Sequence, residues 1–353
     1  MENVTNDSFH YADNDADIDW VVAPLEWTWR TIIQLILAIL GVLGNLLVIC
    51  VYVNRKRMKS CTNVFIVGLA VADLITSIHQ FPYPVATTVP NTIGGELYCR
   101  IIFSWFTMWS SIIASVFTLT LIACERYVAV VYAVHYRSIF SNKRSRYLLM
   151  SCWVGAIVIN TQSLYISYPE PEGHECIVQY PTIAFQRFIG LSFFLVEFIL
   201  PMAIMLFTQV RTIRTLRRQA GSLSSDRKEA NRPALSLLQA RRRVIEMFFI
   251  VIITFIICWL PDQILYFCYM MGILPASFLN SPLYQALVVL AFANSCINPF
   301  IYAARNSHFR HALRDLILRG KRNRVHSVDV NTIDVQGNEF PPDTLAGQGG
   351  ASG

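Results

Sequence analysis

Charged residues are scarce in this chain. Only 15% of its 353 residues are Asp, Glu, Lys or Arg, whereas a soluble globular domain carries about 25%. Apolar side chains make up 54% of the sequence, and the mean hydropathy is +0.44. This balance excludes an ordinary soluble domain and indicates that most of the chain lies in a membrane.

The N-terminal region lacks the basic stretch followed by an apolar stretch that marks a cleaved signal peptide. Residues 1–28 are short and acidic. We expect them to form an extracellular tail, and we expect the first apolar run to direct membrane insertion. Asn3 and Asn6 begin triplets that fit the acceptor pattern for N-linked glycans, although such triplets also occur by chance.

What the chain does have is seven long apolar runs, each at least as long as the ~20 residues of a membrane-spanning helix. They cover residues 30–53, 63–89, 100–124, 147–167, 183–208, 244–271 and 283–304. We therefore predict an all-α membrane protein, a seven-helix bundle over 29–304, whose termini lie on opposite sides of the bilayer. Residues 320–353 have few large apolar side chains and are expected to be a disordered cytoplasmic tail.

The net charge of +6 comes from basic residues that gather beside these runs. Lys and Arg follow the first, third and seventh runs and fill the segment 211–243 between the fifth and sixth. By the positive-inside rule these segments face the cytoplasm, which puts the N-terminus outside. A nucleic-acid-binding patch is excluded because the basic residues lie in short loops next to apolar runs.

Most of the nine cysteines lie within or beside apolar runs, where we expect reduced packing residues. Cys99, at the outer start of the third run, and Cys176, in the loop after the fourth, both face the oxidising side. That location makes them the natural disulfide pair. Cys268, near the outer end of the sixth run, is the competing partner.

The seventh run carries polar residues and a proline where hydrocarbon surrounds the helix. Asn294, Asn298 and Tyr302 are each four residues apart and so share one helix face, while Pro299 removes a backbone hydrogen bond. Polar groups inside a membrane are costly unless they face the bundle interior. The pattern indicates a deformable helix with a functional inner face; a tolerated kink with satisfied amides is the alternative.

Asp73 lies within the apolar second run. A charge at the bilayer centre costs ~2.5–3.5 kcal/mol, so this carboxylate needs partners or a proton. The polar residues of other runs that could reach it are Asn45, Ser115, Asn294, Ser295 and Asn298. One carboxylate among neutral oxygens suits a sodium ion, and a purely structural hydrogen-bond hub fits the residues equally well.

The third run has a stripe of residues on one face. Met108, Ser115 and Arg126 are separated by seven and eleven residues, which a helix brings to the same side. The stripe ends in Glu125-Arg126-Tyr127, where Glu125 can hold the Arg126 guanidinium until another group competes for it.

The sixth run contains a bend beside a bulky side chain. Pro261 interrupts the helix, and Trp259 lies just to its inner side. Such a bend favours two alternative packings, whereas the simpler explanation is an aromatic core residue next to a tolerated proline.

Together these features resemble the rhodopsin-like, class A G-protein-coupled receptors, and the resemblance covers roughly residues 29–319. It rests on motifs in the family's spans and order: Gly44-Asn45, Leu69-Ala70-x-x-Asp73, Cys99, Glu125-Arg126-Tyr127, Trp153, Cys176, Pro201, Cys258-Trp259-Leu260-Pro261 and Asn298-Pro299-x-x-Tyr302. Residues 305–319, with Phe309 opening an apolar stripe, look like the family's membrane-surface eighth helix.

The resemblance implies a plasma-membrane receptor that couples to a heterotrimeric G protein and is regulated by a receptor kinase and arrestin. Arg126 would receive the terminal helix of the G protein, and Asp73 with its partners would bind sodium, the only cofactor expected. Trp259 would lie beneath the ligand pocket, and Tyr302 would swing inward on activation.

The sequence departs from the family pattern at three points. Gln209 stands where the fifth helix usually has an activating tyrosine. Cys99 is two residues farther from Arg126 than is typical, which predicts a longer third helix or a local bulge. No cysteine follows Cys296, so the common palmitoyl anchor after the eighth helix is absent.

Within the family, a neuropeptide receptor similar to the galanin-like branches is the best fit. An opsin needs a lysine in the seventh span, and all five lysines are expected in the cytoplasm. Amine receptors carry an aspartate where this chain has Met108. The residues expected to bind the ligand are Met108, Glu197, Trp259, Asp262 and Gln263.

We expect the ligand to be a peptide with a basic group. Glu197, Asp262 and the acidic residues around Cys176 give the outer mouth one sign of charge, which attracts the opposite sign. Alternatively, Asp262 pairs with Arg187 or Arg100.

The competing class of protein is a seven-span transporter or channel. Many transporters have repeated halves, and no repeat relates the halves of this sequence. Enzymatic activity is not expected, because no His, Cys or Asp cluster with catalytic or metal-ligand spacing falls in one compartment.

Overall fold

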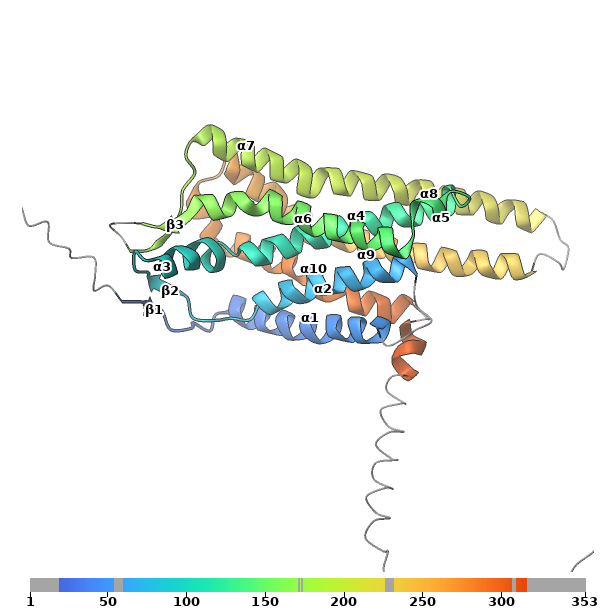
Figure 1. Ribbon diagram of the computed structural model, residues 1–353, viewed down its shortest axis with the longest axis horizontal. Coiled ribbons are helices and arrows are strands. Elements are labelled where there is room, and N and C mark those ends of the chain that lie inside the picture. Colours follow the sequence, from blue (N-terminus) through green and yellow to red (C-terminus); the bar gives the residue numbers. More distant parts are fainter. Residues whose placement is uncertain are drawn as a thin grey trace, which may run out of the picture. The chain divides into compact units, whose positions relative to one another are not determined.

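The computed structural model describes residues 19–53, 60–170, 172, 174–225, 232–306 and 309–315. Seven helical spans in these ranges are long and apolar enough to cross a membrane, which confirms the predicted seven-helix bundle. Figure 1 shows these long helices lying side by side. Residues 1–18 and 316–353, with the expected glycan sites and tail, lie outside the described residues.

Five of the spans are single continuous helices, and two of these contain an internal proline, Pro261 and Pro299. These five are α1 (Trp29–Val53), α2 (Cys61–His79), α6 (Asn142–Ile166), α9 (Arg232–Met270) and α10 (Pro282–Arg305). Polar side chains cap three of them: Ser60 accepts from the backbone of α2, Ser141 from that of α6 and Ser281 from that of α10. These caps satisfy N–H groups that the first turn of a helix leaves without partners.

The third span is interrupted near the end that carries Cys99, which we call the outer end after the expected orientation. It consists of α3 (Ile93–Leu97), the π-helix η2 (Tyr98–Phe103) and α4 (Phe106–Val131). Between the last two, Trp105 has a φ of 55°, an uncommon conformation for a residue other than glycine. The local bulge predicted from the position of Cys99 is thereby confirmed, since a π-helix holds more residues per turn than an α-helix.

The fifth span also contains a π-helix. It runs through α7 (Ile183–Phe193), η3 (Phe194–Ile199) and α8 (Leu200–Ser225). Glu197 belongs to η3, so one of the expected ligand-binding residues lies at an irregular turn. Single π-helical turns are frequent at functional sites.

The α4 helix occupies the centre of the bundle. It packs against α2, α6 and α8, while α1 and α9 each pack against α10 to complete the ring. Close approach is visible where α1 meets α10: a Cβ atom at Gly44 would lie 2.9 Å from Cγ of Pro299. Glycine at this position lets the seventh span pack directly against the backbone of the first.

The second span is shorter than the apolar run predicted. The run extends to residue 89, but α2 ends at His79, because Pro82 and Pro84 cannot continue a helix. The chain instead forms β2 (Ala86–Thr88), which pairs antiparallel with β1 (Val21–Val22). Part of the segment expected to be a tail is therefore folded against the first outer loop.

A second hairpin forms in the loop before the fifth span. Its strands are β3 (Ser167–Pro169) and β4 (Cys176–Val178), paired antiparallel. Cys176 is joined to Cys99 of η2 by a disulfide, while Cys268 is a free thiol. The remaining short helices are α5 (Tyr136–Ile139) and the 3-10 helix η5 (Ala276–Asn280).

Residues 309–315 form a short helix that belongs to a separate compact unit. Phe309 and Ala312 are buried, whereas Arg310 and Arg314 are exposed, the spacing of an amphipathic helix. The sequence placed the start of this helix at 305. Instead, Arg305 is the last residue of α10, and residues 316–319 lie beyond the described part of the chain.

Candidate functional site

A cavity of about 360 Å³ opens between the outer ends of the helices. Its walls come from the third to seventh spans and from the β3–β4 hairpin, and include Trp109, Asn160, Val178, Glu197, Asp262 and Tyr284. The volume falls in the range of small-molecule sites. Three of the five expected ligand-binding residues, Glu197, Asp262 and Gln263, line this cavity.

Both carboxylates of the cavity have a buried oxygen without a hydrogen-bond partner. These atoms are Oε1 of Glu197 and Oδ1 of Asp262, and Asp262 is only 4% exposed. The alternative pairing of Asp262 with Arg100 or Arg187 is not found among the described residues. Arg100 instead donates to Glu96 at 3.2 Å and to the carbonyl of Leu164 at 2.5 Å.

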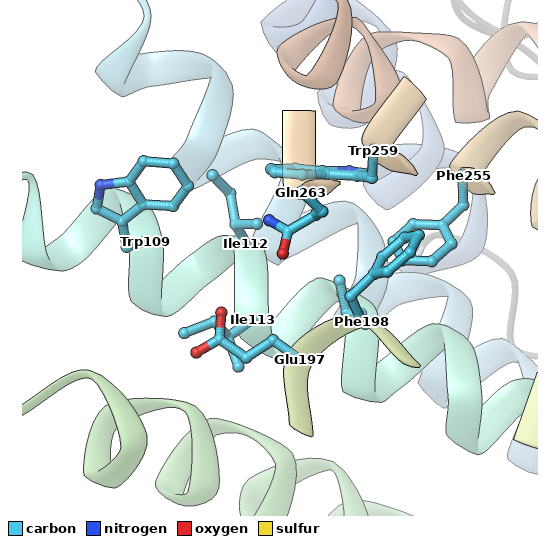
Figure 2. A pocket seen from close by; sticks show the side chains of 9 residues that line it. Trp109, Ile112, Ile113, Glu197, Phe198, Phe255, Trp259 and Gln263 are labelled. Atoms are coloured by element: carbon cyan, nitrogen blue, oxygen red, sulfur yellow. The ribbon is translucent and has the colours of Figure 1, made fainter. Parts of the chain in front are cut away.

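A smaller void of about 20 Å³ lies under this cavity and shares Glu197 and Gln263 with it. Figure 2 shows the side chains that line the void, which include Glu197, Gln263, Trp259, Phe255 and Phe198. The space is about that of one water molecule. Trp259 thus lies beneath the larger cavity, two residues before Pro261 inside α9.

Met108 is placed differently from the other expected ligand-binding residues. It is 3% exposed and lies outside both sets of cavity-lining residues. The neighbouring Trp109 lines both cavities. Successive residues of a helix point about 100° apart. The sequence stripe therefore identified the right turn of α4, but Met108 lies on the neighbouring face and Trp109 on the face that lines the cavity.

The middle of the bundle holds a polar cluster around Asp73, which is 0% exposed. Ser115 donates to its Oδ1 at 2.9 Å and Asn298 donates to its Oδ2 at 2.8 Å. The hydroxyl of Ser295 also lies beside the carboxylate. Second, third and seventh spans therefore meet at one acidic side chain, as the sequence predicts.

The other two members of the expected cluster are less direct. Asn45 donates to the carbonyls of Gly41 and Ser295, each at 3.0 Å, so it joins the first span to the seventh without touching Asp73. Asn294 is buried, and no hydrogen bond links it to Asp73. Oδ1 of Asn298 is a buried oxygen without a partner, so the donor set fits a hard cation that prefers oxygen ligands.

At the inner end of α4, the Arg126 guanidinium is held by its neighbour. Its Nε and a terminal nitrogen each lie 2.5 Å from an oxygen of Glu125, which is itself 0% exposed. Thr62 of α2 donates to Glu125 at 3.1 Å and also contacts Arg126. Tyr136 of α5 donates to the same carboxylate at 2.5 Å.

Thr62 and Tyr136 were not identified from the sequence. Thr62 is 63 residues from Glu125 in the chain and Tyr136 is 11 residues from it, and neither belongs to a motif. Burial and the hydrogen bond to Glu125 raise the pKa of the Tyr136 hydroxyl, which keeps it a donor. Tyr127, the third residue of the motif, lies apart from this network and packs against Tyr132 and Phe207.

Gln209 and Tyr302 occupy the inner half of the bundle. The side-chain amide of Gln209 donates at 2.8 Å to the carbonyl of Ile245, which ties α8 to α9. Tyr302 is 1% exposed. Where the family usually has a tyrosine, this chain therefore has a direct bond between the fifth and sixth spans.

The fold and this arrangement of sites define a seven-span receptor, and comparison with known proteins gives the family. Residues 44–302 match the 7 transmembrane receptor (rhodopsin family), and the chain belongs to this family of G-protein-coupled receptors. It is accordingly a multi-pass membrane receptor and not an enzyme.

Its relatives include receptors named for two different ligands. The Mus musculus melatonin receptor type 1A is 30% identical over 294 residues, which are 79% of this chain and 77% of the relative. The Danio rerio galanin receptor 2a is 28% identical over 292 residues, with coverage of 81% and 77%. The Rattus norvegicus galanin receptor type 2 is 28% identical over 282 residues, with coverage of 79% and 73%.

Proposed function

We propose that this receptor binds an extracellular peptide through a basic group and in response activates a heterotrimeric G protein. The observation that carries the proposal is the pair of carboxylates, Glu197 and Asp262, that line one outer cavity with buried oxygens lacking partners. Burial of a carboxylate without a partner is unfavourable. A ligand cation would supply the missing partner.

The peptide nature of the ligand is supported by the mouth of the cavity. The loop that carries the β3–β4 hairpin contains Glu170, Glu172 and Glu175, which add negative charge around the entrance and steer cations toward it. A cavity of about 360 Å³ takes one or two side chains of a peptide, and the rest would lie across the hairpin. Galanin receptors are among the relatives.

The G protein would bind at the inner end of α4. In the arrangement described above, both oxygens of Glu125 hold Arg126, so the guanidinium is engaged within the receptor. We infer that activation releases Arg126 to the terminal helix of the G protein, with Pro299 allowing α10 to bend and Tyr302 to move inward. Glu125, Arg126, Tyr127, Pro299 and Tyr302 are the residues assigned to this coupling.

Sodium would bind at Asp73 with Ser115, Asn298 and the residues around them. The ion would supply positive charge to a buried carboxylate whose present partners are neutral donors. A more compact arrangement around the ion would favour the inactive packing of the helices. Asn45, Asn294 and Ser295 would support this site.

In the cell, the receptor would lie in the plasma membrane with its N-terminus outside. Asn3 and Asn6 would then carry glycans, and the basic inner segments would be available to a receptor kinase and arrestin. The positive-inside distribution of Lys and Arg supports this orientation.

The test is G-protein nucleotide exchange in cells that express the receptor and are challenged with a panel of secreted peptides. For an active peptide, each Arg or Lys is then replaced singly by a neutral residue. Asp262→Asn or Glu197→Gln should lower the potency of the basic peptide more than about tenfold, since a buried charge pair loses one member. The potency of the neutral analogue should change little.

The exposed Glu26→Gln serves as the control, because it removes a carboxylate at the outer side but outside the cavity. Equal losses for basic and neutral peptides would contradict charge pairing. Silence across the panel together with measurable solute flux would instead support the transporter alternative.

A further inference from the structure

The ligand cavity has a second polar wall on the side of the fourth span. Asn160, Gln162 and Ser163 of α6 line it, together with Ser104 and Trp105 from the interruption of the third span. None of these residues carries a charge. The cavity is therefore chemically divided, with carboxylates on the fifth and sixth spans and neutral amides and hydroxyls on the fourth.

Asn160 is fixed by bonds within the protein. Its Nδ2 donates to the carbonyl of Phe106 at 2.8 Å and to Oγ of Ser110 at 3.1 Å. Because a carbonyl can only accept, the nitrogen must face Phe106, which settles the orientation of the amide. Ser163 in turn donates to the backbone carbonyl of Asn160 at 2.8 Å. These bonds make a rigid wall.

Gln162 differs from its neighbours. Its Oε1 is buried without a partner, and its side-chain amide makes no hydrogen bond within the described residues. Oε1 of Glu197 and Oδ1 of Asp262 are in the same condition and line the same cavity. Three residues from three spans thus line one space, and each has a buried acceptor without a partner. Buried polar atoms are nearly always paired, so such a gathering calls for a ligand.

We propose that Gln162 recognises an uncharged amide group of the ligand, such as a peptide bond or a carboxamide, while the carboxylates hold the basic group. This inference rests on the proposed function and adds a second recognition point to it. The ligand class is then a cation joined to an amide, with both groups inside the cavity.

An amide fits this position better than the other common polar groups. The side chain of Gln162 offers one carbonyl acceptor and one NH₂ donor, the complement of an amide. A ligand carboxylate would face two acidic residues in the same cavity, and a second cation would gain more from them than from a neutral carbonyl. An analogue without the N–H would leave Oε1 unpaired, which is the usual basis of strong discrimination.

The experiment uses full-length receptor in nanodiscs and measures binding of small probes by ligand-observed NMR. The probes are ω-guanidinoalkanamides of increasing chain length, each with its N,N-dimethylamide and the matching alkylguanidine. At the chain length that spans the cavity, the primary amide should bind about three- to tenfold more tightly than its dimethylamide, the measure of one neutral hydrogen bond.

Gln162→Met should reduce this ratio to about one while leaving the affinity for the alkylguanidine unchanged. Gln162→Glu keeps the acceptor and should keep the preference for the primary amide. The adjacent Thr161→Val is the matched control, since Thr161 is exposed and bonds only to the carbonyl of Val158. It should change neither measurement.

The two levels of the proposal fail separately. If the alkylguanidines bind wild type and Asp262→Asn equally, the proposed recognition of a cation is wrong. If they bind through the carboxylates but the amide ratio is one at every length, or persists in Gln162→Met, the role of Gln162 is wrong. Absence of binding by every probe would count against both.

Discussion

The outer and inner halves of the bundle differ in how their charges are satisfied. In the outer half, Glu197 and Asp262 line a cavity, and each has a buried oxygen without a partner. In the inner half, Glu125 is wholly buried and accepts from Arg126, Thr62 and Tyr136. The two cavity carboxylates thus have oxygens without partners, whereas the carboxylate at the inner end is satisfied by three residues of the protein itself.

Because of this difference, binding of a partner has opposite requirements at the two ends. A partner at the outer end adds interactions that the receptor alone does not make. A partner at the inner end must first compete with interactions already present. The Asp73 cluster lies between them and joins the second, third and seventh spans, so it is positioned to couple the two.

Removal of the inner cation should have the largest effect. Arg126→Ala is expected to reduce agonist-stimulated nucleotide exchange at least tenfold, because the group proposed to receive the G protein is lost, while agonist affinity without G protein stays within about twofold. Radioligand binding and GTPγS exchange on the same membranes measure the two. Arg146→Ala, an exposed arginine on α6, is the control, and parallel loss of binding and exchange would make Arg126 structural.

Cutting the tether at the outer end should mainly affect stability. The Cys99–Cys176 bond closes a segment of 77 residues, which in the chain-entropy model contributes about 4 kcal/mol. Cys99→Ser with Cys176→Ser should therefore lower the melting temperature and weaken agonist binding. Cys268→Ser, which removes a free outer thiol, should do neither, and a double variant as stable as wild type would contradict the prediction.

Removing the charge of Asp73 should abolish the effect of sodium on agonist affinity but leave the response to agonist in place. Asp73→Asn keeps the shape of the side chain but not its charge, so sodium should no longer lower agonist affinity. Agonist binding across a sodium titration, compared with the exposed Asp19→Asn, provides the measurement. If sodium leaves wild-type binding unchanged, the cluster is a structural hub only.

The smallest expected change concerns the bond from Tyr136. Tyr136→Phe removes one donor from Glu125 and should raise basal nucleotide exchange about two- to fivefold, as expected for one hydrogen bond. Ligand affinity should not change. Tyr147→Phe, exposed on α6, is the matched control, and unchanged basal exchange would remove Tyr136 from the switch.

The pH dependence of this contribution follows from the raised pKa of Tyr136. The folded state favours the neutral hydroxyl of Tyr136. The contribution of this hydroxyl to folding stability is therefore fully present below its unfolded pKa of about 10, and it is lost only as the pH rises through the higher pKa of the folded state. The difference in basal exchange between wild type and Tyr136→Phe should therefore be constant between about pH 6 and 9.

The bundle could be predicted because each span carries its own signal of length and hydropathy. The polar cluster was equally accessible, since Asp73, Ser115 and Asn298 are polar residues in apolar surroundings and have few other partners available. Pro82 and Pro84 also indicated that the second span ends early, but the predicted span followed the continuous apolar composition as far as residue 89. The irregular turn in the third span was also predictable, because Cys99 lies farther from Arg126 than is typical of the family.

The unpredicted features depend on contacts between residues of different helices. Tyr136 and Thr62 have no distinguishing local pattern, and they become important only because α5 and α2 meet Glu125. Gln162 is one amide in a polar stretch of α6, and only the structure identifies it as unpaired. The face of α4 that meets the cavity is set by helix packing around the irregular turn at Trp105. The sequence does not reveal this packing, and it predicted Met108 as a cavity residue although Trp109 is the residue that lines the cavity.

The pairing of β1 with β2 constrains the lengths of the two segments that contain these strands. Val21 aligns with Thr88, and the backbone N–H of Ala23 donates to the carbonyl of Val85 at 3.0 Å. An insertion in either segment would shift the alignment of the other, because neighbouring residues on a strand point to opposite faces. Among descendants of this receptor, the linker into the first span and the first outer loop should therefore change length together.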